Sequence, residues 1–315
     1  MTLSQKRQTL VGLGFMAPWI VGFLLLVVYP FAMSLYWSFC DYDLLSAPTF
    51  VGGKHYSRLA EELAAGEGFG RVLWNTAYYA GISVPLSIAL GLSLAVVLSW
   101  RVRGQAIWRT LVFLPSVVPV VAMAILWRWL LDPHAGPVNA LVSLTGLPQP
   151  GWFHDYREAA WLPGWFTGDA GFGSKDALIL MSLWGVGNFM VIYLAALGDV
   201  PQRLHEAAAL DGAGRLARFR HVTLPILSPV IFFNLTMGLI QAVQTFTQIY
   251  IVSEGTGEPE RSTLMLSLHL FLSAFQDLNM GYASAMAWML FLVLSGITVL
   301  LFRSARWWVY YEGQS

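Results

Sequence analysis

The sequence predicts an all-α integral membrane protein with six transmembrane helices. Of its 315 residues, 57% are hydrophobic and 11% are charged, whereas a soluble domain averages about 25% charged residues. The charged residues also leave long uncharged intervals, and a helix of roughly 20 apolar residues crosses the hydrocarbon core of a bilayer. Backbone groups in hydrocarbon must hydrogen-bond internally, so each interval is expected to be helical. This composition excludes an ordinary soluble enzyme.

Six uncharged intervals are long enough to span the bilayer and are dominated by apolar residues. They are residues 8–40, 72–100, 110–127, 177–198, 221–253 and 278–302. The first follows Lys6 and Arg7, and its apolar run is too long for a signal peptide, so we expect an uncleaved anchor. Prolines in the first three predict kinked helices, whose freed carbonyls need neighbours in a bundle. The prolines from which we expect kinks are Pro30, Pro85, Pro115 and Pro119.

Two further uncharged intervals do not qualify as spans. Residues 133–154 contain four prolines and three glycines, so a loop is expected there. Residues 262–276 are too few to cross the bilayer, but their Leu and Phe side chains form a helical stripe. This stripe predicts an interfacial or re-entrant helix before the last span.

The distribution of Lys and Arg orients the six spans. The chain has 18 basic and 18 acidic residues, so its formal charge is zero. If the termini and the loops at 101–109 and 199–220 are cytoplasmic, eleven basic and four acidic residues lie inside, and seven basic and fourteen acidic residues lie outside. The two sides then carry +7 and −7, and short loops rich in Lys and Arg stay inside. We expect a multi-pass protein of the cytoplasmic (inner) membrane with both termini cytoplasmic.

Several chemistries lack the residues that would support them. The single cysteine, Cys40, excludes an internal disulfide, and no Cys/His spacing resembles a metal site. There is no G-x-x-x-x-G-K-[ST] pattern, so the chain carries no P-loop for ATP. The six intervals hold no Asp, Glu, Lys or Arg, which disfavours a proton-coupled carrier and a membrane-embedded enzyme. We identify no catalytic residue, and the zero net charge gives no indication of nucleic-acid binding.

The cytoplasmic loop at about 199–225 contains the most informative pattern in the chain. Pro201 suits the first turn of a helix, residues 202–210 are good helix formers, and Gly212 ends the helix. Three successive alanines, 207–209, allow another surface to approach closely. Taken by itself, this segment is an amphipathic surface helix between two spans.

The spacing of the loop closely resembles that of a known family. Glu206-Ala207-Ala208, then Gly212, then Val222-x-Leu224-Pro225 resembles the E-A-A…G…I-x-L-P loop of permease subunits in binding-protein-dependent ABC importers, with Val222 in place of isoleucine. Asp211 and Phe219 also resemble the carbohydrate-type members. The rest of the chain looks like the first of the two permeases of maltose-type and glycerol-phosphate-type systems. The residues that carry this likeness are Tyr29-Pro30, Trp37-Ser38-Phe39, Asn75-Thr76, Leu114-Pro115 and Gly281-Tyr282-Ala283.

The resemblance implies the maltose-type (type I) ABC importer permease fold with a short cytoplasmic coupling helix. It divides the chain into an anchor helix with the first extracytoplasmic connector at 1–70, a permease core at 71–303, and a cytoplasmic tail at 304–315. Within the core lie an extracytoplasmic insertion at about 132–176 and the cytoplasmic loop. The insertion carries an aromatic cluster that is either a partner-docking surface or a set of interfacial aromatic residues. The cluster comprises Trp152, Phe153, Tyr156, Trp161, Trp165, Phe166 and Phe172.

The resemblance also implies partners. They are a second permease subunit, two ATPase subunits that bind ATP and Mg, and an extracytoplasmic solute-binding protein, with no cofactor in this chain. In such systems the loop helix sits in a cleft of the ATPase. Glu206 would pair with a basic group there, and Ala207, Ala208 and Gly212 would permit close packing. Leu224 and Pro225 would couple the loop to the fifth span.

Polar residues inside the spans predict a solute pathway, because such side chains tend to face a cavity or a partner helix. On the fifth span, one helical face carries Asn234, Gln241, Gln244, Thr245 and Gln248. Trp184 shares a face with Asn188 on the fourth span, and Ser284 shares one with Trp288 on the last. Amides beside aromatic rings suit an uncharged sugar. The alternative is that the amides hydrogen-bond between helices and stabilise their packing.

The leading hypothesis is a permease subunit of a binding-protein-dependent ABC importer that translocates a carbohydrate. ATP hydrolysis in partner subunits drives the import, and the subunit itself is no enzyme. One alternative is a glycerol 3-phosphate, other polyol or phosphodiester substrate in the same transporter class. A phosphorylated substrate requires a cation at its site, which favours a neutral carbohydrate. The other alternative is an ATP-independent secondary carrier that acts alone.

Overall fold

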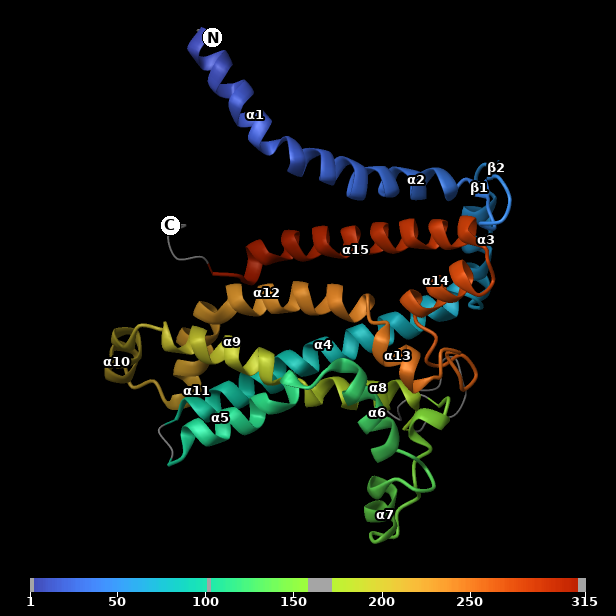
Figure 1. Ribbon diagram of the computed structural model, residues 1–315. Helices are drawn as coiled ribbons and strands as arrows, with labels where there is room; N and C mark the ends of the chain where they lie inside the picture. The colour runs from blue at the N-terminus through green and yellow to red at the C-terminus, as the bar shows by residue number, and fades with distance from the viewer. Residues whose placement is uncertain (1–2, 101–102, 158–171, 311–315) are drawn as a thin grey trace. The chain divides into compact units, whose positions relative to one another are not determined.

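The computed structural model describes residues 3–100, 103–157 and 172–310, and most of them are helical (Figure 1). Its α-helices are α1 (Leu3–Phe23), α2 (Tyr29–Trp37), α3 (Lys54–Ala65), α4 (Phe69–Ser99), α5 (Gln105–Phe113), α6 (Val120–Leu130), α7 (Pro137–Ser143), α8 (Ser174–Trp184), α9 (Gly187–Gly198), α10 (Gln202–Leu210), α11 (Arg215–Arg218), α12 (Leu224–Val243), α13 (Thr247–Val252), α14 (Leu266–Phe275) and α15 (Met280–Trp308). Strands β1 (Cys40–Asp41) and β2 (Thr49–Phe50) pair antiparallel, with Cys40 opposite Phe50. The predicted all-α class is confirmed.

Six segments account for the predicted spans. Four continuous helices are long and apolar enough to cross a membrane: Gly12–Trp37, Phe69–Ser99, Arg215–Val243 and Met280–Trp308. Two bent pairs each add a span if the pair is counted as one: α5 with α6, bent by 96°, and α8 with α9, bent by 45°. The described residues therefore contain four to six candidate spans, at the positions of the six uncharged intervals. The short apolar helix predicted before the last span is α14.

Two π-helical turns lie just before prolines. Leu24–Val28 precedes Pro30 of α2, and Phe219–Thr223 precedes Pro225 of α12. A proline offers no N–H to the preceding turn, and a π turn is one way in which a helix accommodates the missing bond. Both helices continue through these turns, so the prolines reshape the spans without ending them.

The third predicted span is broken rather than kinked. Leu114–Val117 forms a 3-10 turn, and the extended backbone of Val118 and Pro119 separates it from α6. A residue before proline is disfavoured in the helical conformation, which explains the extended Val118. Pro85, in contrast, lies inside α4 without interrupting the helix.

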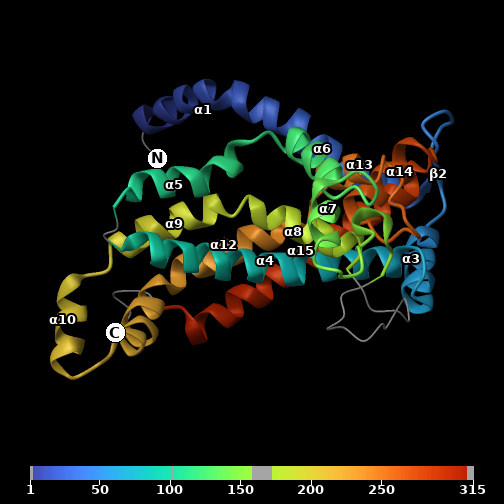
Figure 2. The same ribbon diagram turned by 90° about the horizontal axis from the view of Figure 1, so that it is seen from below.

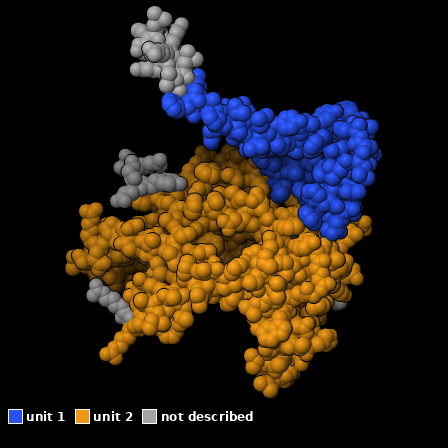
Figure 3. Space-filling model, in the orientation of Figure 1, with its two compact units in different colours: residues 1–65, 270–292 blue, residues 66–269, 293–315 orange. Residues whose placement is uncertain are grey.

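The chain divides into two compact units (Figure 3). Unit 1 comprises residues 1–65 and 270–292. Within it, His55 Nε2 lies 3.0 Å from the Cys40 carbonyl oxygen, and the Tyr282 hydroxyl donates to Glu62 Oε2 over 2.6 Å. Gly281 packs so tightly that an added Cβ would lie 2.0 Å from the Cys40 carbonyl oxygen. The backbone of α15 therefore meets the β1 segment where any side chain would collide.

Unit 2 comprises residues 66–269 and 293–315 and is organised around α4, which packs against α8, α9 and α12. Small residues permit these close approaches. An added Cβ at Gly91 of α4 would lie 2.6 Å from Phe189 Cβ of α9, and one at Gly238 of α12 would lie 2.9 Å from Val84 Cγ1 of α4. Ala95 and Met190, both fully buried, form part of the core between α4 and α9.

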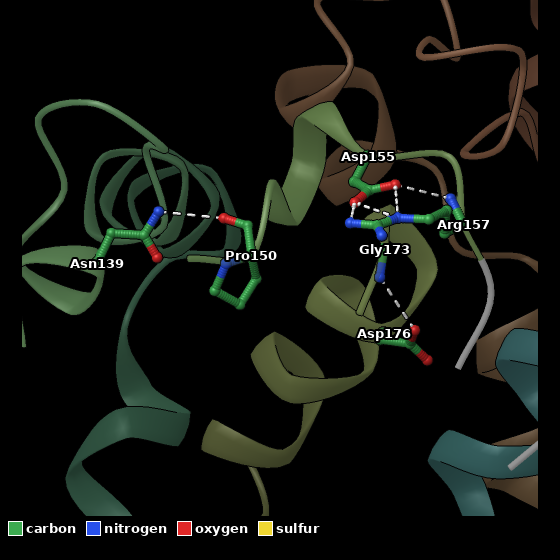
Figure 4. Close-up of polar contacts among 6 residues, drawn as sticks. All are labelled: Asn139, Pro150, Asp155, Arg157, Gly173 and Asp176. Atoms are coloured by element: carbon green, nitrogen blue, oxygen red, sulfur yellow. Dashed lines mark hydrogen bonds and ion pairs between the residues drawn. The ribbon is translucent and has the colours of Figure 1, made fainter. Parts of the chain in front are cut away.

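The insertion contains a short helix where the sequence predicts only loop. Pro137 follows Gly136 and begins α7, because a proline at the first helical position loses no intrahelical hydrogen bond. The helix is held by Asn139, whose Nδ2 donates to the Pro150 carbonyl over 3.1 Å (Figure 4). Trp152 Nε1 donates to Asn139 Oδ1 over 2.7 Å. Gly136 and Pro137 thus mark the start of a helix, whereas the prolines and glycines of this segment, taken from the sequence alone, predict a loop.

A second set of polar contacts fixes the end of the insertion beside α8 (Figure 4). Burial raises the pKa of the Asp155 carboxyl, but hydrogen bonds and the positive charge from Arg157 outweigh burial and hold the pKa below its usual value. The Gly173 N–H donates to Asp176 at the start of α8, and a Cβ at Gly173 would lie 1.9 Å from the Arg157 carbonyl oxygen. This part of the insertion is therefore tightly packed.

The aromatic cluster of the insertion is only partly described. Trp152 and Phe153 are buried, whereas Tyr156 and Phe172 are exposed. The other three members, Trp161, Trp165 and Phe166, lie outside the described residues. Partner docking therefore remains an expectation for this segment.

Candidate functional site

The predicted loop helix is α10, and its bounds, Gln202–Leu210, are those expected from the sequence. It begins after the extended Pro201 and connects α9 to α11. Figure 2 and Figure 1 both show α10 at the end of unit 2 that lies away from α6 and α8. Most of its residues are exposed within the unit.

Gly212 ends α10 through its backbone conformation. Its φ is +81°, a left-handed value that glycine adopts without steric cost. The Gly212 N–H donates to the Ala209 carbonyl and the Ala213 N–H donates to the Ala208 carbonyl, which is the hydrogen-bond pattern of a Schellman motif. The left-handed residue directs the chain from α10 into α11. An added Cβ at Gly212 would meet nothing within 4 Å, so the chain itself leaves that side open.

The pattern residues of α10 form an open surface. Glu206, Ala207, Asp211 and Gly212 are exposed, and Ala208 is half-buried. Within the described part of the chain, the Glu206 carboxylate has no hydrogen bond or ion pair. Leu210 is 90% exposed at the helix end. A carboxylate, small side chains and a large exposed apolar side chain together make this face suited to contact with another protein.

Leu224 and Pro225 begin α12, the helix of the fifth span. They follow α11 and the π turn without a break, so a single helical segment runs from Arg215 to Val243. The Ser228 hydroxyl donates to the Pro225 carbonyl over 2.6 Å and accepts from the Tyr310 N–H over 2.8 Å. One continuous helical segment therefore joins the loop at Arg215 to the fifth span.

A second feature of unit 2 is a cavity of about 720 Å³ lined by residues of α4, α6, α8, α9, α12 and α13. Five residues predicted for the pathway line it: Asn188, Asn234, Gln241, Gln244 and Gln248. Thr245 lines it too. Helices α9, α12 and α13 and the break between α12 and α13 thus bring these amides to one cavity. Asn234 is 3% exposed, and its amide lies beside the buried Tyr193 hydroxyl.

The predicted polar stripe requires one continuous helix through Gln248. The structure instead divides this part of the fifth span into two helices. Helix α12 ends at Val243, and α13 begins at Thr247. The Thr245 hydroxyl donates to the Gln241 carbonyl over 3.0 Å, and its N–H donates to the Ala242 carbonyl. Such local bonds compete with the regular helical pattern. Gln244 and Gln248 therefore reach the cavity from a break and a second helix, rather than from the same face.

Sequence reasoning does not identify several hydroxyl groups in the cavity wall. Tyr79, Ser83 and Ser87 of α4 line it, together with Ser182 of α8. The first three are spaced by four residues, so they share one face of a helix. That spacing is the signal that could have found them.

The described lining of this cavity does not include the two predicted tryptophans. Trp184 is absent from the described cavity wall and packs edge-on against Trp127, with ring centroids 6.0 Å apart. Trp288 belongs to unit 1, where its ring packs on Phe31 at 4.6 Å and its Nε1 donates to Ser34 Oγ over 3.2 Å. Both indoles have neighbours in the chain that account for their positions. Ser284, which shares a face with Trp288, is 7% exposed in the same unit.

The cavity offers neutral hydrogen-bonding groups. Its described lining includes amides and hydroxyls but no Asp, Glu, Lys, Arg or His. Amides and hydroxyls both donate and accept, so they can bind a solute with several hydroxyls without pairing a charge. Phe189, Phe233 and Phe246 add apolar rings to the wall.

Comparison with known proteins identifies the family. Residues 87–309 match the family model of the binding-protein-dependent transport system inner membrane component. The chain belongs to this family. It is 40% identical to the probable ABC transporter permease protein YesP of Bacillus subtilis (strain 168) over 99% of this chain and 95% of that protein. It is 32% identical to the lactose transport system permease protein LacF of Rhizobium radiobacter, over 76% of each chain.

The fold of this permease has solved counterparts. A chain of the bacterial alginate ABC transporter, in a crystal structure with an alginate pentasaccharide-bound periplasmic protein, is 23% identical. The TM-score is 0.73, and the match covers 96% of the permease and 95% of that chain. The protein is therefore a multi-pass membrane permease of an ABC importer, with the type I fold. This assignment favours the importer over an independent secondary carrier.

Proposed function

We propose that this permease conducts a neutral carbohydrate through the cavity between α4, α9 and α12. The observation that carries the proposal is the wall of uncharged amides and hydroxyls. These groups can donate to and accept from several hydroxyls of one solute. The relative LacF, named for lactose transport, supports a sugar. A phosphorylated polyol is disfavoured, because the described wall offers no cation.

The proposed working assembly contains a second permease, two ATPase subunits and an extracytoplasmic binding protein. ATP and Mg would bind to the ATPases, and this chain would hold no cofactor and no metal. The open face of α10 supports the ATPase contact, and the alginate transporter complex with a periplasmic protein supports the binding-protein contact. The charge separation of +7 and −7 supports cytoplasmic termini and a cytoplasmic α10.

Within that assembly, the exposed pattern residues of α10 would contact the ATPase. Glu206 would pair with a basic group, while Ala207, Ala208 and Gly212 allow close approach and Asp211 lies beside them. Leu224 and Pro225 would pass the movement on to the fifth span through the continuous helix that ends at Val243. This chain would then transmit ATPase closure to the cavity without performing catalysis.

The cavity proposal is tested with Gln241→Ala and Gln244→Ala in proteoliposomes that contain the complete transporter. Each loses a neutral amide from the wall, so uptake of a labelled sugar should fall about fivefold to tenfold, as one hydrogen bond of about 1 kcal/mol or more is lost. Gln276→Ala, at an exposed position outside the cavity wall, is the matched control.

Thermal unfolding of the same variants separates binding from packing. If the amides only hold helices together, Gln241→Ala and Gln244→Ala will lower the unfolding temperature and leave the sugar concentration for half-maximal uptake unchanged. That result would overturn the assignment of the cavity. A changed half-maximal concentration with an unchanged unfolding temperature supports it.

A further inference from the structure

A second cavity of about 980 Å³ lies in unit 2 beside α10 and has a different character. Part of its wall is apolar and comes from α4 and α9, including Leu92, Val96, Leu194 and Leu197. The other part comes from α5, α10 and α11 and carries positive or titratable groups. These are Arg109, His205, Arg215 and Arg218, and the described lining contains no Asp or Glu.

Arg218 places a buried donor without an acceptor, among the described residues, in this wall. Its side chain is half-buried, and its Nε is shielded from solvent with no hydrogen-bond acceptor among the described residues. A buried donor left unpaired is destabilising, and more so if the group is charged. The Nη1 and Nη2 donors of Arg218 are not buried and have no acceptor among the described residues, so an anion that enters the cavity can bind them.

The neighbouring arginines add donors to the same wall. Arg109 is held in place because its Nε and Nη2 donate to the Leu98 carbonyl, over 3.3 and 3.0 Å, at the end of α4. A guanidinium has five N–H donors, so most of its capacity beyond these bonds remains. Arg215 is exposed, and neither arginine forms an ion pair in the part of the chain that the structure describes. All three guanidinium groups line the cavity and have N–H donors left for an anion.

We propose that this cavity binds an anionic phospholipid, with the phosphate held by Arg218 and Arg215. Basic pockets between membrane helices on the cytoplasmic side are suited to anionic lipid head groups. The acyl chains would follow the apolar wall, since Leu92, Val96, Leu194 and Leu197 all belong to spans. This apolar wall favours a lipid over an acidic protein segment, which would gain nothing from it. The site rests on the membrane assignment and is independent of the transported sugar.

The test is native mass spectrometry of the purified complete transporter with phosphatidylglycerol and, separately, phosphatidylcholine. The wild type should retain phosphatidylglycerol at least tenfold more tightly than phosphatidylcholine. Arg218→Gln should weaken phosphatidylglycerol binding about tenfold, because a charge-assisted pair to phosphate is lost. Arg218→Lys should restore part of the affinity. Arg220→Gln, an equal charge change at an exposed residue outside the cavity wall, should leave it within twofold.

Each remaining outcome overturns the proposal. Equal retention of the two lipids, or equal loss in Arg218→Gln and Arg220→Gln, would mean that the cavity has no lipid phosphate site. Displacement of phosphatidylglycerol by millimolar inorganic phosphate would identify a free-anion site instead. Lipid bound to the separated permease but absent from the complete transporter would show that an ATPase segment fills the cavity. Lipid retention is measured by mass, so a failed sugar-uptake experiment does not affect it.

Discussion

At the residue scale, Gly212 belongs to the loop pattern because the chain there needs a left-handed backbone conformation. Its position after a run of helix formers predicts where α10 ends. The structure adds the reason, a φ of +81° with a pair of hydrogen bonds to Ala208 and Ala209. Gly214, two residues later, has an ordinary φ of −66°, and an added Cβ there also meets nothing within 4 Å. Both glycines therefore have room for a side chain, but only Gly212 has a backbone conformation that favours glycine.

We predict that Gly212→Ala impairs coupling and that Gly214→Ala does not. Alanine in a left-handed conformation costs roughly 1 kcal/mol, which would distort the turn after α10. Substrate-stimulated ATP hydrolysis by the complete transporter should fall severalfold in Gly212→Ala and stay near wild type in Gly214→Ala. Equal rates for the two variants, at equal membrane insertion, would show that this turn is unimportant for coupling.

Residue patterns could predict the amides of the cavity but not the positions of the tryptophans. Asn188 and Gln241 are polar residues in apolar spans, and burial of such groups needs a cavity or a partner. Trp184 and Trp288 are amphipathic and can pack in many environments. Their neighbours, Trp127 and Phe31, are distant in sequence, so no local spacing identifies them.

At the scale of elements, the packing of α4 depends on where a glycine faces another helix. Gly81 and Gly91 are both in α4, but only Gly91 lies against α9, where an added Cβ would come 3.3 Å from the Met190 backbone nitrogen. An added Cβ at Gly81 would meet nothing within 4 Å. The sequence shows two equivalent glycines, and the tertiary contact distinguishes them.

We predict opposite stability effects of alanine at these two positions. Gly91→Ala overpacks the α4–α9 contact and should destabilise the permease by about 1–3 kcal/mol. Gly81→Ala should be neutral or stabilising by up to about 1 kcal/mol, because alanine favours the helix. Thermal unfolding in detergent measures both. A Gly91→Ala variant as stable as Gly81→Ala would contradict the packing described for α4 and α9.

Local sequence also predicts the positions of helix breaks only in part. Prolines in the spans predict deviations, and π turns lie before Pro30 and Pro225. Yet Pro85 leaves α4 continuous, while Pro119 follows the extended Val118 at a 96° break. A single proline costs a hydrogen bond, and its neighbours decide whether the helix bends or stops. The break after Val243 has no proline at all and was not predictable from this signal.

At the scale of the whole molecule, the Lys and Arg distribution predicts the orientation, because short loops rich in these residues stay inside. The uncharged intervals predict the fold class. They follow from the cost of placing charge in hydrocarbon, which is why sequence alone predicts six span positions and the all-α class. The positions of side chains around the cavity depend on contacts between spans, which no single interval encodes. The resemblance of the 206–225 pattern supplies the family, and the family match over residues 87–309 establishes it.

The central claim is that α10 is the cytoplasmic contact through which a partner ATPase drives this permease. Glu206→Cys, in a Cys40→Ser background that removes the single native cysteine, permits a direct test with a membrane-impermeant maleimide. We expect labelling in inside-out vesicles, none in right-side-out vesicles, and protection when the ATPase is assembled. Labelling in right-side-out vesicles, or labelling that the ATPase leaves unchanged, would contradict the claim.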